Sequence, residues 1–353
     1  MKMLLQRYLW FGLFFNVACA HNIQKQDNTK KDAWTWLYSR IFTESELGVH
    51  ANRSQVFFLK ENVPLFSQLI FSWNALRPQK GYFSFAVQVR NAQTGRWGAW
   101  HRMVDWGAAV QRSYTSKSDG VSGYDFVRLE VDEGTLADGF RIKVVAHDGV
   151  SLPLLKACAV SLTHFNNFKP EVIDQQLKSL SSVHIRNVPM MSQFALDHPK
   201  NDAICSPTSC SMLTSFLLKK PVDPLDFAQK SFDDGLGIYG SWSLNMAHAF
   251  ERCNGEFLFF AARLNSFGRL HQRLKRGMPV VVSVRGPIQG GALPYRNGHL
   301  LVVVGWDSKK REVIVHDPAF KSDSETVRRY RIKDFLEAWE RSRRLAYLVE
   351  EMS

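Results

Sequence analysis

The first half of this 353-residue chain is a succession of short strand-like segments separated by turn signals, with no helical period between them. The segments are rich in β-branched and aromatic residues, and several alternate apolar with polar side chains, which is typical of half-buried strands. They cover residues 56–59, 68–73, 82–90, 126–131, 140–146 and 158–163. Turn-forming stretches such as Arg77–Gly81 and Ser118–Gly120 lie between them. This order predicts an all-β sandwich, jelly-roll-like, over residues 51–168.

The second half mixes helical and strand patterns, which predicts an α+β domain over residues 186–353 after a linker at 169–185. Apolar residues at helical spacing follow Cys205 and recur over 242–250 and 267–276, and buried strands are expected at 279–284, 300–307 and 312–316. A chain of this length is expected to hold two such domains.

Residues 1–20 have the composition of a secretory signal peptide. Lys2 and Arg7 precede an apolar run that is too short to span a bilayer easily, and small residues end the segment at Ala20. We therefore expect an exported protein, periplasmic or extracellular, without a transmembrane span, in which residues 21–50 are a linker and N-terminal extension. The alternative is a lipid anchor at Cys19, but Asn16 stands where a lipoprotein signal has an apolar residue.

The chain carries 45 Lys and Arg against 33 Asp and Glu, a net charge of +12. These charges are spread along the sequence, and no motif that reads a nucleic-acid groove accompanies them. A solvated basic face is therefore favoured over nucleic-acid binding.

Four cysteines follow Cys19, at positions 158, 205, 210 and 253. They are too few for a disulfide scaffold and lack the spacing of a zinc site. If Cys205 stays free, one disulfide at most can form. Cys210 with Cys253 is one such pair, and buried thiols are the other option.

Cys205 comes immediately before an expected helix, where unpaired N–H groups and the helix dipole lower a thiol pKa and can hold an oxyanion. His299 opens one apolar strand and Asp317 follows the next. If these strands form a hairpin, the histidine can take the thiol proton and the aspartate can orient it. Asp307, in the turn between the strands, is the nearest competitor for the third position. The alternative roles are a core thiol, a structural histidine and a turn aspartate.

Two segments, Val188–Leu213 and Gly298–Ala319, resemble the papain-like cysteine peptidases of family thirty-nine. This family includes double-glycine leader peptidases of bacteriocin exporters and stand-alone exported bacterial relatives. The resemblance rests on an apolar segment ending in glutamine, Cys-Ser-Pro-Thr-Ser at a helix start, Gly-His before an apolar strand, and Asp-Pro. It covers the C-terminal half and none of the sandwich.

The resemblance implies a papain-like fold and four roles: Cys205 is the nucleophile, His299 the general base, Asp317 its orienting partner and Gln193 an oxyanion donor. It also implies a peptide or protein substrate and chemistry that needs no metal or cofactor. The sequence departs from the family at Ser206, where the family has glycine, and in a longer loop between glutamine and cysteine.

Three further expectations concern activity and ligands. A thiol acyltransferase or amidase would use the same triad, so both alternatives stay open. An inactive papain-like domain would leave function to the sandwich, whose tryptophans 73, 97, 100 and 106 suit a cell-wall or carbohydrate contact, or are ordinary core residues. The Gly-rich segment Gly286–Gly291 is expected to be a mobile loop at the substrate cleft, or a plain connection.

Overall fold

The computed structural model of the chain describes residues 33–48, 54–170, 177 and 179–352. The expected signal peptide, with Cys19, lies outside the described residues, as does the polar linker at 24–31 and most of 171–178. Within the described ranges, no helix combines the length and the apolar character needed to cross a membrane.

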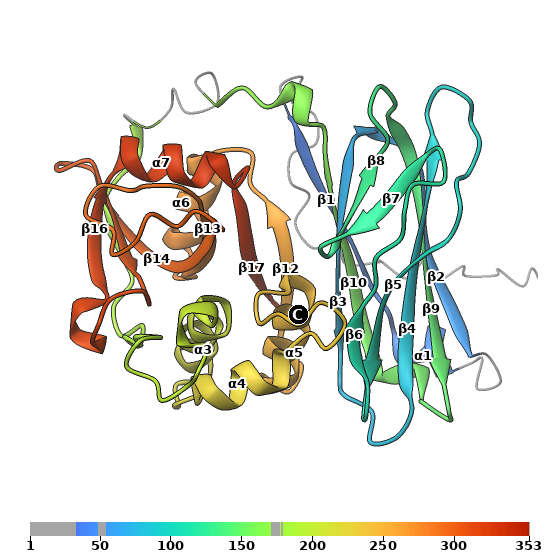
Figure 1. Cartoon of the computed structure of the whole chain (residues 1–353), viewed down its shortest axis with the longest axis horizontal. Helices are drawn as coiled ribbons and strands as arrows, with labels where there is room; N and C mark the ends of the chain where they lie inside the picture. The colour runs from blue at the N-terminus through green and yellow to red at the C-terminus, as the bar shows by residue number, and fades with distance from the viewer. Residues whose placement is uncertain (1–32, 49–53, 171–176, 178, 353) are drawn as a thin grey trace, which may run out of the picture.

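The N-terminal part is an antiparallel sandwich of two five-stranded sheets (Figure 1). The first sheet has the order β1 (Thr35–Ile41), β10 (Leu155–Thr163), β3 (Gln68–Ala75), β8 (Arg128–Val131), β7 (Ser122–Asp125). The second has the order β2 (Gln55–Phe66), β9 (Ala137–His147), β4 (Tyr82–Asn91), β5 (His101–Gly107), β6 (Gln111–Ser113). Apolar residues that alternate along β4 and β9 fill the space between the sheets. The short helix α1 (Glu44–Gly48) follows β1.

The sandwich begins earlier than the sequence predicted. Residues 35–41 fall in the expected linker and extension, yet they form the edge strand β1 and pair with β10 from Thr35↔Thr163 to Ile41↔Ala157. Burial of two large apolar side chains explains the difference. Trp36 packs in the core of the sandwich, and the buried Trp34 ring lies beside Phe168 and donates to the Asn265 carbonyl.

One predicted strand also starts later than expected. Phe126 and Val127 have φ values of 41° and 60°, so they form the turn between β7 and β8, and β8 starts at Arg128. A two-residue hairpin turn with positive φ suits the twist of the strands. Bulky residues seldom adopt this conformation, and the sequence therefore gave no turn signal there.

The C-terminal part is an α+β domain built on one mixed-length antiparallel sheet. Its strand order is β12 (Phe257–Arg263), β17 (Leu345–Glu351), β13 (Val280–Val284), β14 (His299–Asp307), β15 (Glu312–His316), β16 (Val327–Arg331), and β11 (Val183–His184) pairs with β14. Its helices are α3 (Cys205–Leu218), α4 (Pro224–Ser231), α5 (Trp242–Arg252), α6 (Phe267–Lys275) and α7 (Ile332–Arg341). The predicted class, an all-β sandwich followed by an α+β domain, is confirmed.

Helices cover both faces of this sheet (Figure 1). On β14, Leu300, Val302 and Val304 belong to the core that includes α3 and α5. The intervening Leu301 and Val303 belong to the core that includes α6 and α7. A strand buried on both faces needs an unbroken apolar run, and this explains the sequence pattern of residues 300–304.

The two domains meet along the edge of the C-terminal sheet. Strand β12 is an edge strand, and side chains from β3 of the sandwich bind its outward backbone groups. Asn74 Oδ1 accepts from the Phe259 amide (2.8 Å), and Asn74 Nδ2 donates to the Phe259 carbonyl (3.1 Å). Ser72 Oγ accepts from the Ala261 amide (3.0 Å). The sandwich therefore caps a strand edge that would otherwise expose unpaired backbone groups.

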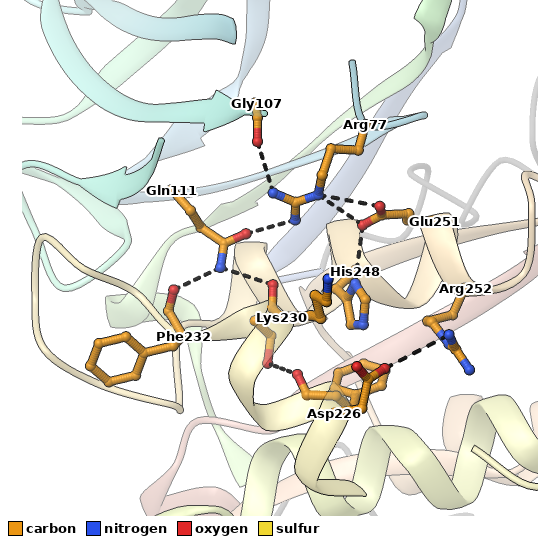
Figure 2. Close-up of polar contacts among 11 residues, drawn as sticks. Arg77, Gly107, Gln111, Asp226, Lys230, Phe232, His248, Glu251 and Arg252 are labelled. Carbon is orange, nitrogen blue, oxygen red and sulfur yellow. Dashed lines mark hydrogen bonds and ion pairs between the residues drawn. The ribbon is translucent and has the colours of Figure 1, made fainter. Parts of the chain in front are cut away.

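A second set of contacts joins the domains beside α5 (Figure 2). Arg77 pairs with Glu251 (3.1 Å) and donates to Gln111 Oε1 (2.7 Å) and to the Gly107 carbonyl (2.9 Å). Gln111 Nε2 in turn donates to the carbonyl of Phe232, after α4 (2.7 Å). These side chains fix the segment between α4 and α5 on the sandwich.

The sandwich tryptophans divide into two groups. Trp73 and Trp106 are fully buried and pack edge to face in the core, so they are not available to a ligand. Trp97 and Trp100 lie beside β9, and each has a basic side chain of that strand over its ring. Each cation occupies one face of its indole ring, so that face is not open to a stacked sugar.

Candidate active site

Cys205 is the first residue of α3. The Ile204 carbonyl begins the helix by accepting from the backbone amide of Thr208 (3.1 Å) and from its Oγ1 (2.8 Å). Pro207 lies in the first turn, where a missing N–H costs no helical hydrogen bond. Cys205 is half-buried, whereas the next ten residues of the helix are buried. The helix therefore presents its first side chain to the surface and anchors the rest.

The four described cysteines are all free, which excludes a Cys210–Cys253 disulfide in this structure. Cys158, Cys210 and Cys253 are buried, and burial raises the pKa of each thiol. Cys205 is thus the described cysteine that combines access with a lowered thiol pKa.

The β14–β15 hairpin brings His299 and Asp317 together. β14 begins at His299 and β15 ends at His316, so both residues lie at the same end of the hairpin. His299 Nε2 is 2.7 Å from Asp317 Oδ1, and both side chains are almost fully buried. Asp307 lies at the opposite end, where its carboxylate binds the turn amides of Lys309 and Lys310.

Asp317 accepts four hydrogen bonds in total. Besides His299, the Ala319 amide donates to Oδ1 (3.0 Å), and the hydroxyls of Tyr295 (2.8 Å) and Tyr330 (2.7 Å) donate to Oδ2. Burial opposes ionisation, but the charge and hydrogen bond of His299, with the bond from Tyr330, hold the pKa of Asp317 below its ordinary value. A carboxylate surrounded by donors requires a proton on His299 Nε2, so Nδ1 is the nitrogen available to the thiol.

Neither tyrosine was identified from the sequence. Tyr295 comes four residues before His299 in a loop, and Tyr330 lies in the edge strand β16. Nothing in their local patterns distinguishes them from other tyrosines, and only the folded hairpin reveals their common partner.

Cys205 and His299 shift each other's pKa in opposite directions. Burial favours the neutral thiol, but the hydrogen bond and charge of His299, with backbone N–H groups of Leu300 and Ser206, lower the pKa of Cys205. Burial likewise favours neutral imidazole, but Asp317 and then Cys205 raise the pKa of His299. Both pKa shifts favour a thiolate–imidazolium pair.

Two serines beside the thiol hold α3 against the sheet. Ser209 Oγ donates to the Leu300 carbonyl (3.0 Å), which ties the first turns of α3 to the start of β14. Ser206 stands where the related family has glycine, and its Oγ bonds Tyr347 Oη (2.9 Å) in the domain core. The extra side chain thus points into the domain core.

Gln193 lies between the two halves of the site. Its backbone amide donates to the Pro318 carbonyl (2.9 Å), next to Asp317, and its Nε2 donates to the Asn201 carbonyl (2.8 Å), in the loop before Cys205. The side chain is buried, and its Oε1 has no hydrogen-bond partner among the described residues. One hydrogen of the Gln193 side-chain amide therefore holds the long loop before Cys205. The role of oxyanion donor would use the second hydrogen of this amide and stays a prediction.

Among the described residues, no group of three or more His, Cys, Asp and Glu side chains is arranged to hold a metal ion. The arrangement brings together a thiol, an imidazole and a carboxylate, a set of groups that suits attack on a carbonyl carbon.

Three comparisons relate the chain to known proteins. Residues 185–347 match the model of the Peptidase_C39 like family. Comparison with curated proteins gives no match. Among solved structures, the chain is similar to xylellain, a cysteine protease from Xylella fastidiosa, with 11% identity over 53% of this chain and 91% of that chain and a TM-score of 0.30. The family match covers the C-terminal α+β domain, residues 185–347, and supports a cysteine peptidase.

Proposed function

We propose that this chain is an exported peptidase that hydrolyses peptide bonds through Cys205, His299 and Asp317. The observation that carries the proposal is the position of His299, which is bonded to buried Asp317 through Nε2 and interacts with the Cys205 thiol at the start of α3. Export rests on the sequence of residues 1–20 alone.

The reaction begins with the thiolate–imidazolium pair. The Cys205 sulfur attacks the carbonyl carbon of the scissile peptide bond, and the carbonyl electron pair moves to the oxygen. The Cys205 backbone N–H and Gln193 Nε2 stabilise this oxyanion. When the tetrahedral intermediate collapses, the C–N bond breaks and His299 Nδ1 gives its proton to the leaving amine.

The second half-reaction releases the acyl group. His299, now neutral, takes a proton from water, and the hydroxide oxygen attacks the thioester carbon. Collapse of this intermediate returns the thiolate and frees a carboxylic acid. Asp317 stays ionised throughout and orients the imidazole. No metal or cofactor takes part in either step.

Profiling of newly formed peptide termini tests the proposal. A library of peptides from a digested proteome is incubated with the wild-type chain, with Cys205→Ala and with Cys253→Ala, which alters a buried thiol elsewhere in the domain. We expect new termini with the wild type and Cys253→Ala, and a loss of at least a thousandfold with Cys205→Ala.

The same experiment separates the alternatives. Products joined to an added amine, in place of free carboxyl termini, would indicate acyl transfer. Release of ammonia from side-chain amides would indicate an amidase. Equal product patterns from wild type and Cys205→Ala would contradict the proposed activity and favour an inactive binding domain.

A further inference from the structure

Tyr295 contacts both partners of the His299–Asp317 pair. Its ring lies parallel to the imidazole, with centroids 4.3 Å apart and an interplanar angle of 8°. Its hydroxyl donates to Asp317 Oδ2 (2.8 Å). The side chain is only 5% exposed, so the ring forms a wall of the site. Among the described residues, this is the aromatic ring stacked on His299.

The loop before His299 is built around the same residue. Tyr295 has a φ of 40°, an unfavourable conformation for a bulky side chain. Its carbonyl accepts from the amides of Gly286 (3.0 Å) and Gly298 (3.1 Å), and its hydroxyl accepts from the Ala292 amide (3.2 Å). These bonds hold the strained backbone in place, as is common at functional sites. The segment that the sequence predicted as mobile is therefore anchored to the acid–base pair.

We propose that Tyr295 is a positioning residue that holds His299 as an imidazolium facing Cys205 and links the loop 286–298 to this charge state. The inference rests on the proposed role of the Cys205–His299 pair. The electron-rich face of a phenol ring stabilises a cation stacked on it, and a parallel ring 4.3 Å away restricts rotation of the imidazole. Displacing the loop would remove the ring face and a hydrogen bond to Asp317 together.

Tyr330 provides a matched comparison within the same site. Its hydroxyl donates to the same oxygen, Asp317 Oδ2, at 2.7 Å, but from strand β16 on the other side of the hairpin. Removing its hydroxyl deletes one hydrogen bond and leaves the ring on His299 in place. Tyr295→Phe deletes the equivalent bond to Asp317, together with the bond from the Ala292 amide, and keeps the ring, whereas Tyr295→Leu removes the ring as well.

The test is the pH dependence of Cys205 alkylation by iodoacetamide in wild type, Tyr295→Phe, Tyr295→Leu, Tyr330→Phe and His299→Ala. A preformed ion pair gives a rate plateau on the acid side of neutrality. We expect Tyr295→Phe and Tyr330→Phe to keep this plateau within about threefold. Tyr295→Leu should lower it at least tenfold at neutral pH and add a second rise at alkaline pH, where an ordinary thiol ionises.

The possible results separate the two hypotheses. A wild-type profile identical to that of His299→Ala would contradict the activated thiol itself. If Tyr295→Leu is folded by thermal unfolding and retains the wild-type plateau in alkylation rate, only the role of Tyr295 is overturned. Equal losses in Tyr295→Phe and Tyr295→Leu would also overturn it, because the hydrogen bond alone would then explain the effect.

Discussion

The buried carboxylate of Asp317 sets the charge state of the site. Its four donors keep it ionised, and its charge outweighs the burial that would otherwise keep His299 neutral. His299 in turn lowers the pKa of the Cys205 thiol. The charge on His299 therefore depends on Asp317, and the ionisation of the Cys205 thiol depends on His299. The reactivity of the half-buried sulfur thus originates in the fully buried carboxylate of Asp317.

Asp317→Asn should weaken catalysis and narrow its pH range. Without the negative charge, the pKa of His299 falls, so imidazolium is lost at a lower pH as the solution is made more alkaline. We expect kcat/KM to fall by about tenfold to a thousandfold, and its alkaline limit to move to lower pH. Asp307→Asn, at the far end of the hairpin, is the control and should keep the wild-type profile. An unchanged alkaline limit in Asp317→Asn would contradict this prediction.

The sequence indicated the candidate nucleophile, base and carboxylate because each stands at the end of a strongly patterned element. Cys205 starts an apolar-faced helix, and His299 and Asp317 bracket two apolar strands. Tyr295 and Tyr330 escaped prediction because a loop and an exposed edge strand bring them to Asp317, and no local periodicity encodes that meeting.

At the scale of elements, the site depends on how α3 packs on β14. These elements carry the proposed nucleophile and base, which are far apart in the sequence. The buried hydrogen bond between Ser209 and the Leu300 carbonyl fixes α3 against β14. The sequence predicted both elements from their apolar patterns. It did not predict the strands β1, β5–β7, β11, β12, β16 and β17. Most of these are short or lie at sheet edges, where packing against neighbours outweighs the local pattern, but β5 and β17 are interior strands.

Ser209→Ala should therefore lower both stability and thiol reactivity. The change leaves a buried carbonyl with one partner fewer, and we expect the free energy of unfolding to fall by about 1–3 kcal/mol. Loss of register between α3 and β14 should also slow Cys205 alkylation several-fold. Thr214→Val is the control, because the Thr214 hydroxyl bonds the Cys210 carbonyl within the same helix. If both variants slow alkylation equally, the link to β14 is not what positions the thiol.

At the scale of the whole molecule, the sandwich completes the C-terminal sheet. Asn74 and Ser72 satisfy the backbone of β12, and the network around Arg77 holds the segment between α4 and α5. No sequence pattern in either domain predicted these contacts, because they join residues from separate halves of the chain. The sandwich is consequently a structural partner of the peptidase domain in addition to any binding role.

Asn74→Ala should open the edge of the C-terminal sheet. It removes both side-chain bonds to the Phe259 backbone, and each buried group left unpaired costs about 1–3 kcal/mol. We expect faster hydrogen exchange at the amides of Phe259 and Ala261, measured by mass spectrometry or NMR. Asn91→Ala is the control, since Asn91 binds turn amides within the sandwich. Unaltered exchange at Phe259 in Asn74→Ala would show that this contact does not protect the edge.

His248 should make the domain junction sensitive to acid (Figure 2). It is buried against the Phe227 ring, and its Nδ1 is 3.1 Å from Glu251. In the part of the chain that the structure describes, its Nε2 has no hydrogen-bond partner. Burial lowers the pKa of His248; Arg77 and Arg252 add to this effect, and Glu251 opposes it. The unfolded chain therefore binds the proton more readily than the folded one.

The sign of the effect follows from that difference. The contribution of His248 to stability is present above the ordinary histidine pKa of 6.5 and is lost as the pH falls below it. In urea unfolding at about pH 7.5 and about pH 5, His248→Gln should reduce the acid loss of stability by on the order of 1 kcal/mol. A larger acid loss in the variant would contradict this assignment.

The central claim is that His299 holds Cys205 as a thiolate at neutral pH. The most direct measurement is the ultraviolet absorbance of the thiolate during a pH titration, with Cys205→Ser subtracted to isolate this sulfur. The account predicts that the wild-type signal is present at and below neutral pH, well under the ordinary thiol pKa of 9.0, and that in His299→Ala it appears only near or above that value. A thiolate that titrates at the ordinary value in both proteins would contradict it.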